Sequence, residues 1–193
     1  MLNEMRPEID LSSGELVEDH VVTDALLEYF QKPEYQAAPG FLLDGFPRTS
    51  RQIDLTSERW PKHLQISSAI KLNVPDFVCE TKLLGRRLCT ECNGNFNVNG
   101  VHRDGWDLPP SLPPLAGQAS SCSKEACEEL YWVDRPDDTP DIIRGRLQTY
   151  HRHMDPILDH FDERGRLLKL TPYRGYDDVE KMIQDVRRWM DSH

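Results

Sequence analysis

The sequence has no long hydrophobic run and few basic residues for its acidic content. None of its apolar stretches approaches the roughly 18 residues that a membrane-spanning helix needs, which predicts no such helix. Residues 1–7 have no apolar core, so they do not resemble a signal peptide. With 33 acidic against 23 basic residues, the formal net charge is -10. These features fit a soluble protein and argue against a nucleic-acid or membrane partner.

Cysteine is also scarce, at five residues in 193. Nothing indicates secretion, so disulfide bonds are not expected. The Cys89-x-x-Cys92 spacing is usual for the first half of a zinc ribbon, and Cys122 and Cys127 could complete a tetrahedral zinc site that stabilises a loop-rich segment. That second pair is separated by four residues rather than two, so a metal-free segment with retained thiols is an equal alternative. Cys79 stands alone and is interpreted as a core residue.

The arginines, in contrast, are concentrated in a few segments. The 193-residue length is about one domain and allows a proper core. An acidic protein that gathers guanidinium groups locally is expected to bind a small polyanionic ligand rather than a polymer. The concentrated arginines are Arg48, Arg51, Arg86, Arg87, Arg103, Arg135, Arg144 and Arg146.

Hydrophobic periodicity predicts strands that alternate with helices. Strands separated by helices predict an α/β fold in three layers, with a parallel sheet and helices on both faces. Residues 88–134, rich in Cys, Gly, Asn and Pro, are expected to form an inserted, loop-rich module. The expected helices are residues 16–30, 50–59, 76–87 with Asp76 as N-cap, 141–161 with a candidate kink at Pro156, and 177–190; the expected strands are residues 41–44, 69–74 and 167–170.

Residues 40–52, with the sequence GFLLDGFPRTSRQ, are the most informative stretch. A short strand, expected to be buried on both faces, ends there in Asp44, a turn at Gly45 and then Arg48. Gly45 lets the backbone approach a ligand, and ligands in open α/β sheets bind at the carboxyl ends of strands. This layout suits a phosphate group; an ordinary strand and turn is the alternative.

The same stretch closely resembles the signature of the adenylate kinases, which transfer a phosphoryl group between ATP and AMP. The related UMP/CMP kinases share the Gly-Phe-Pro-Arg turn but usually follow it with asparagines, whereas here Thr49 and Gln52 follow, as in adenylate kinases. The resemblance implies that Arg48 binds the AMP phosphate and that Gln52 pairs with the adenine base through its amide, with Gly45 in the same site. It also implies that Asp44 orients the hydration shell of Mg²⁺ through water.

Three further motifs extend the resemblance. Residues 14–19 are similar to the family loop that lies along the AMP adenine; without the family, they read as a helix entry. Residues 85–87 and 135–150 resemble the two halves of a lid hinge, and their alternative is solvated surface charge. The resemblance implies AMP contacts from Glu15, Leu16 and Val17. It also implies a catalytic set of Arg86, Arg135, Arg146 and Asp44. Within this set, Arg135 and Arg146 would bridge the two nucleotides.

The donor side of the resemblance is weaker. Arg86 would contact the ATP phosphates, and Arg174 falls in a loop that touches ATP in the family. Lys82 occupies the place where the family usually has an arginine stacked on the adenine of ATP, and a lysine has no planar face for stacking. Cys122 and Cys127 fall where zinc-bearing lids of the family carry their second pair.

One family feature is missing from the sequence. Adenylate kinases begin with a strand and a P-loop, and no Gly-x-x-x-x-Gly-Lys motif occurs here. We therefore expect an N-terminally truncated kinase; an inactive nucleotide-binding or interaction module, or a zinc-ribbon binding module, is the alternative. The expected organisation is a partial AMP-binding lobe at residues 1–36, a core at 37–87 and 135–193, and a lid at 88–134.

The resemblance thus implies the reaction ATP + AMP = 2 ADP, in adenine nucleotide homeostasis. Its expected ligands are ATP, AMP and ADP, with Mg²⁺ as the cofactor of ATP and structural Zn²⁺ as a further candidate. We expect a monomer in the cytoplasm, with the mitochondrion and plastid left open because a targeting peptide would precede the P-loop.

Overall fold

The structure is a computed structural model that describes residues 17–35, 37–112 and 132–192. The chain forms two compact units: residues 1–70 with 148–168, and residues 71–147 with 169–193. Each unit has hydrophobic clusters of its own.

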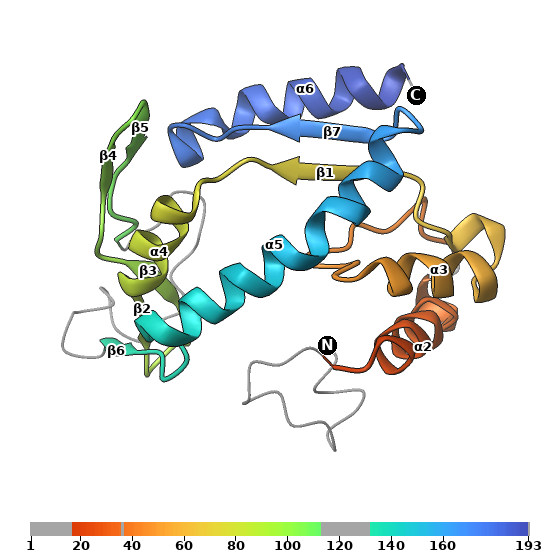
Figure 1. The fold of residues 1–193 in the computed structure, drawn as a ribbon, viewed down its shortest axis with the longest axis horizontal. Coiled ribbons are helices and arrows are strands. Elements are labelled where there is room, and N and C mark those ends of the chain that lie inside the picture. Colours follow the sequence, from red (N-terminus) through yellow and green to blue (C-terminus); the bar gives the residue numbers. More distant parts are fainter. Residues whose placement is uncertain (1–16, 36, 113–131, 193) are drawn as a thin grey trace. The chain divides into compact units, whose positions relative to one another are not determined.

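The first unit is built on two helices, α2 (Asp19–Phe30) and α3 (Ser50–Arg59), which pack side by side (Figure 1). Phe30 and Trp60 are buried between them, with ring centroids 5.6 Å apart in an edge-to-face arrangement. A second cluster brings Ile53 of α3 against Phe161, near the end of the long helix α5 (Pro140–Asp162). The short helices η1 (Pro33–Tyr35) and η2 (Lys62–Leu64) also belong to this unit.

Two parallel strands, β1 (Ala69–Leu72) and β7 (Leu167–Leu170), pair with each other (Figure 1). The N–H of Ala69 donates to the carbonyl of Arg166, and that of Asn73 donates to the carbonyl of Leu170. The partner's number rises with the donor's number, which is the parallel pattern. The α/β class predicted from the sequence is therefore confirmed.

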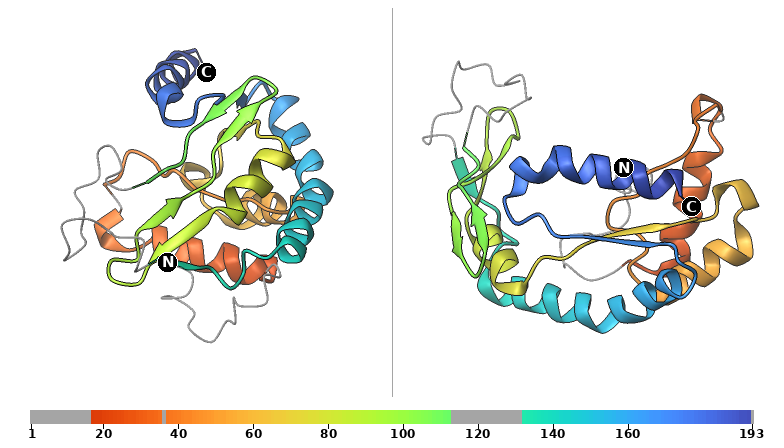
Figure 2. Two further views of the ribbon diagram at one scale, coloured as in Figure 1. Left: turned by 90° about the vertical axis from the view of Figure 1, so that its left-hand side faces the viewer. Right: turned by 90° about the horizontal axis from the view of Figure 1, so that it is seen from above.

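The second unit contains two small antiparallel sheets (Figure 2). In one hairpin, Val101 and Leu108 pair across the strands and pack with Trp106 against Val78 of the preceding helix. The elements are α4 (Asp76–Leu84), β2 (Arg86–Cys89) between β3 (Asn95–Asn97) and β6 (Trp132–Asp134), the hairpin β4 (Val101–Arg103) and β5 (Trp106–Leu108), and η4 (Gly175–Asp178) followed by α6 (Val179–Asp191).

Several predicted elements are shifted at their ends: β1 ends at Leu72, α2 begins at Asp19 and α6 begins at Val179. Two segments differ further from the sequence prediction. Residues 41–44 form no strand: Leu42 is 90% exposed, and no strand among the described residues pairs with this segment. An apolar run becomes a strand only where a neighbour takes up its backbone hydrogen bonds. The helix expected at residues 76–87 ends at Leu84, because Gly85 is its C-cap and Arg86 begins β2; Pro75, not Asp76, is its N-cap residue.

Within the described ranges, no helix is both long and apolar enough to cross a bilayer. Pro156 lies inside α5, which continues through it from Pro140 to Asp162.

Candidate active site

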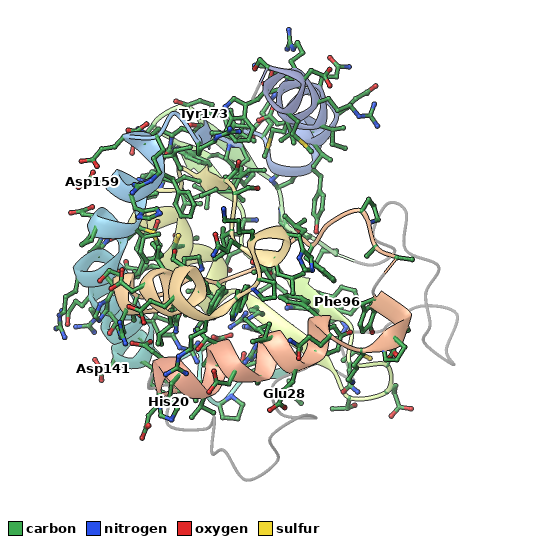
Figure 3. The ribbon with its side chains drawn as sticks, turned by 90° about the vertical axis from the view of Figure 1, so that its right-hand side faces the viewer. His20, Glu28, Phe96, Asp141, Asp159 and Tyr173 are labelled. Atoms are coloured by element: carbon green, nitrogen blue, oxygen red, sulfur yellow. The ribbon has the colours of Figure 1, made fainter. Side chains whose placement is uncertain are left out.

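Three side chains of the first unit, those of Asp19, Thr49 and Gln52, meet at the N-terminal ends of α2 and α3 with the backbone N–H of Arg48; together they are here called the Gln52 cluster. Thr49 is the N-cap of α3, and its Oγ1 accepts the backbone N–H of Gln52 at 3.2 Å. The same hydroxyl donates to Oδ1 of Asp19 at 2.9 Å. Asp19 is the first residue of α2, next to His20, which is labelled in Figure 3. This hydrogen bond therefore ties the two helix N-termini together.

The side-chain amide of Gln52 is buried and engaged at both ends. The residue is 2% exposed. Its Oε1 accepts the backbone N–H of Arg48 at 2.7 Å, and its Nε2 donates to Oδ1 of Asp19 at 3.0 Å. A glutamine amide has two acceptor positions and two N–H donors, so one of each remains for a further partner.

The turn before the cluster requires a glycine. Gly45 has a φ of +68°, and a Cβ at this position would lie 3.1 Å from Nη2 of Arg48. The guanidinium of Arg48 approaches because its Nε donates to the Gly45 carbonyl at 2.8 Å. Arg48 and Asp44 are otherwise exposed, so a charged ligand can reach both. Val17 is half-buried just before α2.

Five side chains of the second unit form an ion-pair network, here called the arginine cluster: Arg86, Arg135, Arg146, Asp137 and Asp138. Arg86 holds Asp138 in a bidentate pair, with Nε to Oδ2 at 2.6 Å and Nη2 to Oδ1 at 2.5 Å. Arg135 holds Asp137 in the same way, at 2.9 Å and 2.7 Å. Arg146 donates to Oδ2 of Asp137 at 2.7 Å and lies 3.8 Å from Asp138. The structure thus brings together Arg86, Arg135 and Arg146, the three arginines of the expected catalytic set.

The charges of this cluster are unevenly compensated. Burial acts to raise the pKa of Asp137, but the hydrogen bonds donated by Arg146 and Arg135 outweigh it and lower the pKa to about 2. The hydrogen bond to Asp138 raises the pKa of Arg86. Three guanidinium groups face two carboxylates, so the cluster has one more basic side chain than acidic side chains.

A cavity of about 420 Å³ lies in the second unit beside α4 and β5. Its lining is mostly apolar, with Leu108, Pro109 and Tyr176 on it, and Lys82 and Arg174 are its basic residues. The loop after β7 lines the cavity with Pro172 and Arg174. The ring of Tyr173 between them, labelled in Figure 3, lies 5.1 Å from Trp106 by ring centroid. The cavity can therefore enclose a flat apolar group next to positive charge.

The two basic residues of the cavity are fixed from within the protein. Nζ of Lys82 donates to the carbonyls of Asn99 and Pro109, each at 2.8 Å, and burial lowers the pKa of this amine. Arg174 pairs with Asp178, from Nη2 to Oδ1 at 3.1 Å. Lys82 consequently joins α4 to the loop after β5, instead of extending freely over the cavity.

Cys89 and Cys92 lie on the β2–β3 hairpin. The N–H of Gly94 donates to Sγ of Cys92 at 3.3 Å, and Asn93 between them has a φ of +56°. One backbone N–H therefore points at this sulfur. Cys89 is buried against Phe96, and the described residues contain no group of three or more metal-ligating side chains. Zinc binding stays a prediction.

Four predicted site residues lie outside the described residues: Glu15, Leu16, Cys122 and Cys127.

Sequence reasoning selected the arginines but missed the carboxylates that orient them. Asp137 and Asp138 were not among the candidate site residues, and neither was Asp19. A signal was available for the first two, because adjacent acids two and three positions after Arg135 are well placed to pair with clustered arginines.

These features define a class: an α/β protein with a parallel strand pair and clustered arginines for an anionic ligand. A sequence model of the adenylate kinase family, described as "Adenylate kinase", matches residues 6–166. The chain belongs to the adenylate kinase family, whose members are phosphotransferases that bind adenine nucleotides.

Individual relatives agree with this assignment. "Probable adenylate kinase 6, chloroplastic" of Oryza sativa subsp. japonica is 33% identical over 167 residues, covering 83% of the chain and 53% of the relative. "Adenylate kinase" of Solanum tuberosum is 33% identical over 178 residues, covering 91% and 58%. "GTP:AMP phosphotransferase" of Plasmodium falciparum is 31% identical over 183 residues, covering 91% and 74%. The chain spans about half the length of the first two of these relatives.

Proposed function

We propose that this chain serves the adenylate kinase reaction, ATP + AMP = 2 ADP, in adenine nucleotide homeostasis. The observation that carries the proposal is the arginine cluster, which gathers three guanidinium groups in a protein of net charge -10. Phosphoryl transfer asks the protein for positioning and positive charge around the transferred group, with no covalent partner. A cluster of this kind has the chemistry that the reaction needs.

The two carboxylates of the cluster act as stand-ins for phosphate in the ligand-free protein. Each presents a pair of oxygens to an arginine fork, as a phosphate does. When nucleotide phosphates bind, Arg86, Arg135 and Arg146 exchange carboxylate oxygens for phosphate oxygens. The arginines are thus already oriented before the ligand arrives, and less side-chain entropy is lost on binding.

The acceptor, AMP, is assigned to the Gln52 cluster and the turn before it. Arg48 binds the AMP phosphate, because its guanidinium is exposed and already held at one side by the Gly45 carbonyl. Gln52 reads the adenine edge with its remaining acceptor position and N–H. Glu15, Leu16 and Val17 would lie along the base.

The donor, ATP, is assigned to the cavity of the second unit. Its apolar lining accepts the base, Arg174 lies at the cavity, and Arg86 contacts the phosphates. Lys82 contributes by holding the cavity wall through Asn99 and Pro109. The family uses Mg²⁺ with ATP, where it would neutralise phosphate charge; Asp44, an exposed hard-oxygen donor, is suited to hold its water shell.

Of the compartments left open by the sequence, the plastid is the one that the names of the relatives support, because several are chloroplastic. We propose that the protein acts as a monomer, with no nucleic-acid or membrane partner.

A coupled assay of ADP formation from ATP and AMP tests the function. We expect turnover that depends on both nucleotides and on Mg²⁺, and loss of about 100-fold or more in kcat/KM for Arg135→Ala, which removes a charge from the cluster. Turnover with a pyrimidine monophosphate in place of AMP, and none with AMP, would rule out the adenylate assignment.

The alternative is a nucleotide-binding or interaction module without catalysis. The absence of a Gly-x-x-x-x-Gly-Lys motif from the sequence favours it. This alternative predicts AMP binding by titration calorimetry with no ADP formation under the same conditions.

A further inference from the structure

We propose that Asp19 is a positioning residue, which fixes the direction of the Gln52 amide and thereby selects adenine over 6-oxopurines. The inference rests on the proposed function of Gln52 in reading the acceptor base. It adds a residue that makes no assigned contact with the ligand.

The neighbours of Gln52 allow only one orientation of its amide. The carboxylate of Asp19 can only accept hydrogen bonds, and the backbone N–H of Arg48 can only donate. The observed contacts, Nε2 to Asp19 at 3.0 Å and Oε1 to Arg48 N at 2.7 Å, satisfy both. A flipped amide would set oxygen against a carboxylate oxygen and N–H against N–H, which is repulsive at both ends.

The carboxylate of Asp19 is itself held in place. Its Oδ1 receives a second donor, the hydroxyl of Thr49 at 2.9 Å, and that hydroxyl also caps α3 at the backbone N–H of Gln52. Three residues thus form a closed hydrogen-bonded ring at the helix start. Burial of Gln52 and Thr49 removes the water that could otherwise replace these contacts.

The fixed orientation of the Gln52 amide determines which purine base can pair with it. Gln52 has one acceptor position left on Oε1 and one N–H left on Nε2. The edge that matches presents a donor beside an acceptor, as the 6-amino group and N1 of adenine do. Hypoxanthine and guanine present a carbonyl oxygen and an N1–H there, so both contacts would be unfavourable.

AMP and IMP differ only in this edge of the base, so they are the probes. We measure the binding of each to the purified protein by titration calorimetry, for wild type, Asp19→Ala and Asp19→Asn. Wild type is expected to bind AMP at least about tenfold more tightly than IMP, since one paired base edge discriminates by roughly that factor or more. Asp19→Ala should lose most of this ratio, chiefly through weaker AMP binding, and Asp19→Asn, which keeps an acceptor oxygen, should restore most of it.

Asp24→Ala is the matched control. Asp24 lies on the same helix and pairs with Arg59 at the surface, 3.1 Å away, while Gln52 bonds to Asp19 instead. Its removal should leave both affinities unchanged. ATP affinity should also be unchanged in all three variants.

The outcomes separate this inference from the proposed function. If wild type binds AMP selectively and a folded Asp19→Ala keeps the AMP:IMP ratio, the positioning role is wrong and the function stands. If wild type shows no preference for AMP, the proposed acceptor and this inference both fail. Should Asp19→Ala not fold by circular dichroism, Asp19→Glu displaces the acceptor by one methylene, and a wild-type ratio in that variant would overturn the role.

Discussion

Arg86 and Arg87 are adjacent in the sequence, but their carboxylate partners differ greatly in exposure. Arg86 pairs with Asp138, whose side chain is 4% exposed, and Arg87 pairs with Asp134, whose side chain is 80% exposed. A buried carboxylate that loses its bidentate partner is left undersolvated, whereas an exposed one turns to water. The two arginines should therefore respond very differently to the same substitution.

We expect Arg86→Lys to lower the free energy of unfolding by about 2 kcal/mol, because a lysine cannot reproduce the two parallel hydrogen bonds to Asp138. Arg87→Lys, the control, should change it by less than about 0.5 kcal/mol. Urea unfolding followed by circular dichroism measures both. Equal effects of the two substitutions would contradict the importance of the buried pair.

The lowered pKa of Asp137 should make the stability of the protein at acid pH depend on the arginine cluster. Its pKa is about 2 in the folded protein, below the ordinary value of 3.8, so folding is favoured by its ionised form. This contribution is fully present above about pH 4 and is lost as the pH falls toward 2. In thermal unfolding between pH 5 and 2, Asp137→Asn should show a shallower loss of Tm than wild type. If the Tm of the two proteins fell in parallel with pH, Asp137 would not be the source of this pH dependence.

For individual residues, the sequence was sufficient to predict the site arginines, but not the carboxylates that pair with them. A guanidinium at a motif position is visible in the sequence, but the pairing of Arg86 with Asp138 joins residues 52 positions apart. The same holds for Asp19 and Gln52, which are 33 positions apart. Only the fold of the chain brings such pairs within hydrogen-bond distance.

At the scale of the element, the start of α3 depends on one hydroxyl. Thr49 Oγ1 accepts the Gln52 N–H and donates to Asp19, so it serves as the helix cap and as a link to α2. Thr49→Val, which keeps the shape and removes the hydroxyl, should cost about 1 to 2 kcal/mol of unfolding free energy. Thr49→Ser should retain nearly all of it. Thermal or urea unfolding compares them, and equal losses in Val and Ser would argue against the cap.

Elements set by local pattern were predictable, and those set by distant pairing were not. Residues 50–59 and 167–170 were predicted with the bounds that the structure has, since α3 has a cap and an amphipathic pattern and β7 is a short apolar run. The segment 41–44 has a similar apolar run but forms no strand. Arg86 begins β2 because it pairs across the sheet with Asn97, a partner that no local signal in residues 76–87 indicates.

For the molecule as a whole, the division into two units matters for the proposed reaction. The Gln52 cluster belongs to the first unit, and the arginine cluster and the cavity belong to the second. The sites assigned to the adenine bases of the acceptor and the donor therefore fall on different units, each with its own hydrophobic clusters. Each ligand should then stabilise its own unit first, because ligand binding protects the residues that it contacts and orders.

Hydrogen exchange measured by mass spectrometry can show which unit each nucleotide stabilises. AMP alone should slow exchange at the starts of α2 and α3, and ATP alone should slow it at residues 82–87, 108–112 and 172–179, which include most of the cavity lining and Arg86. Arg48→Ala should abolish the AMP effect and leave the ATP effect, since Arg48 belongs to the first unit. If AMP instead protected the cavity residues and left α3 unchanged, the acceptor and donor assignments would have to be exchanged. That result would also remove the basis for base reading by Gln52.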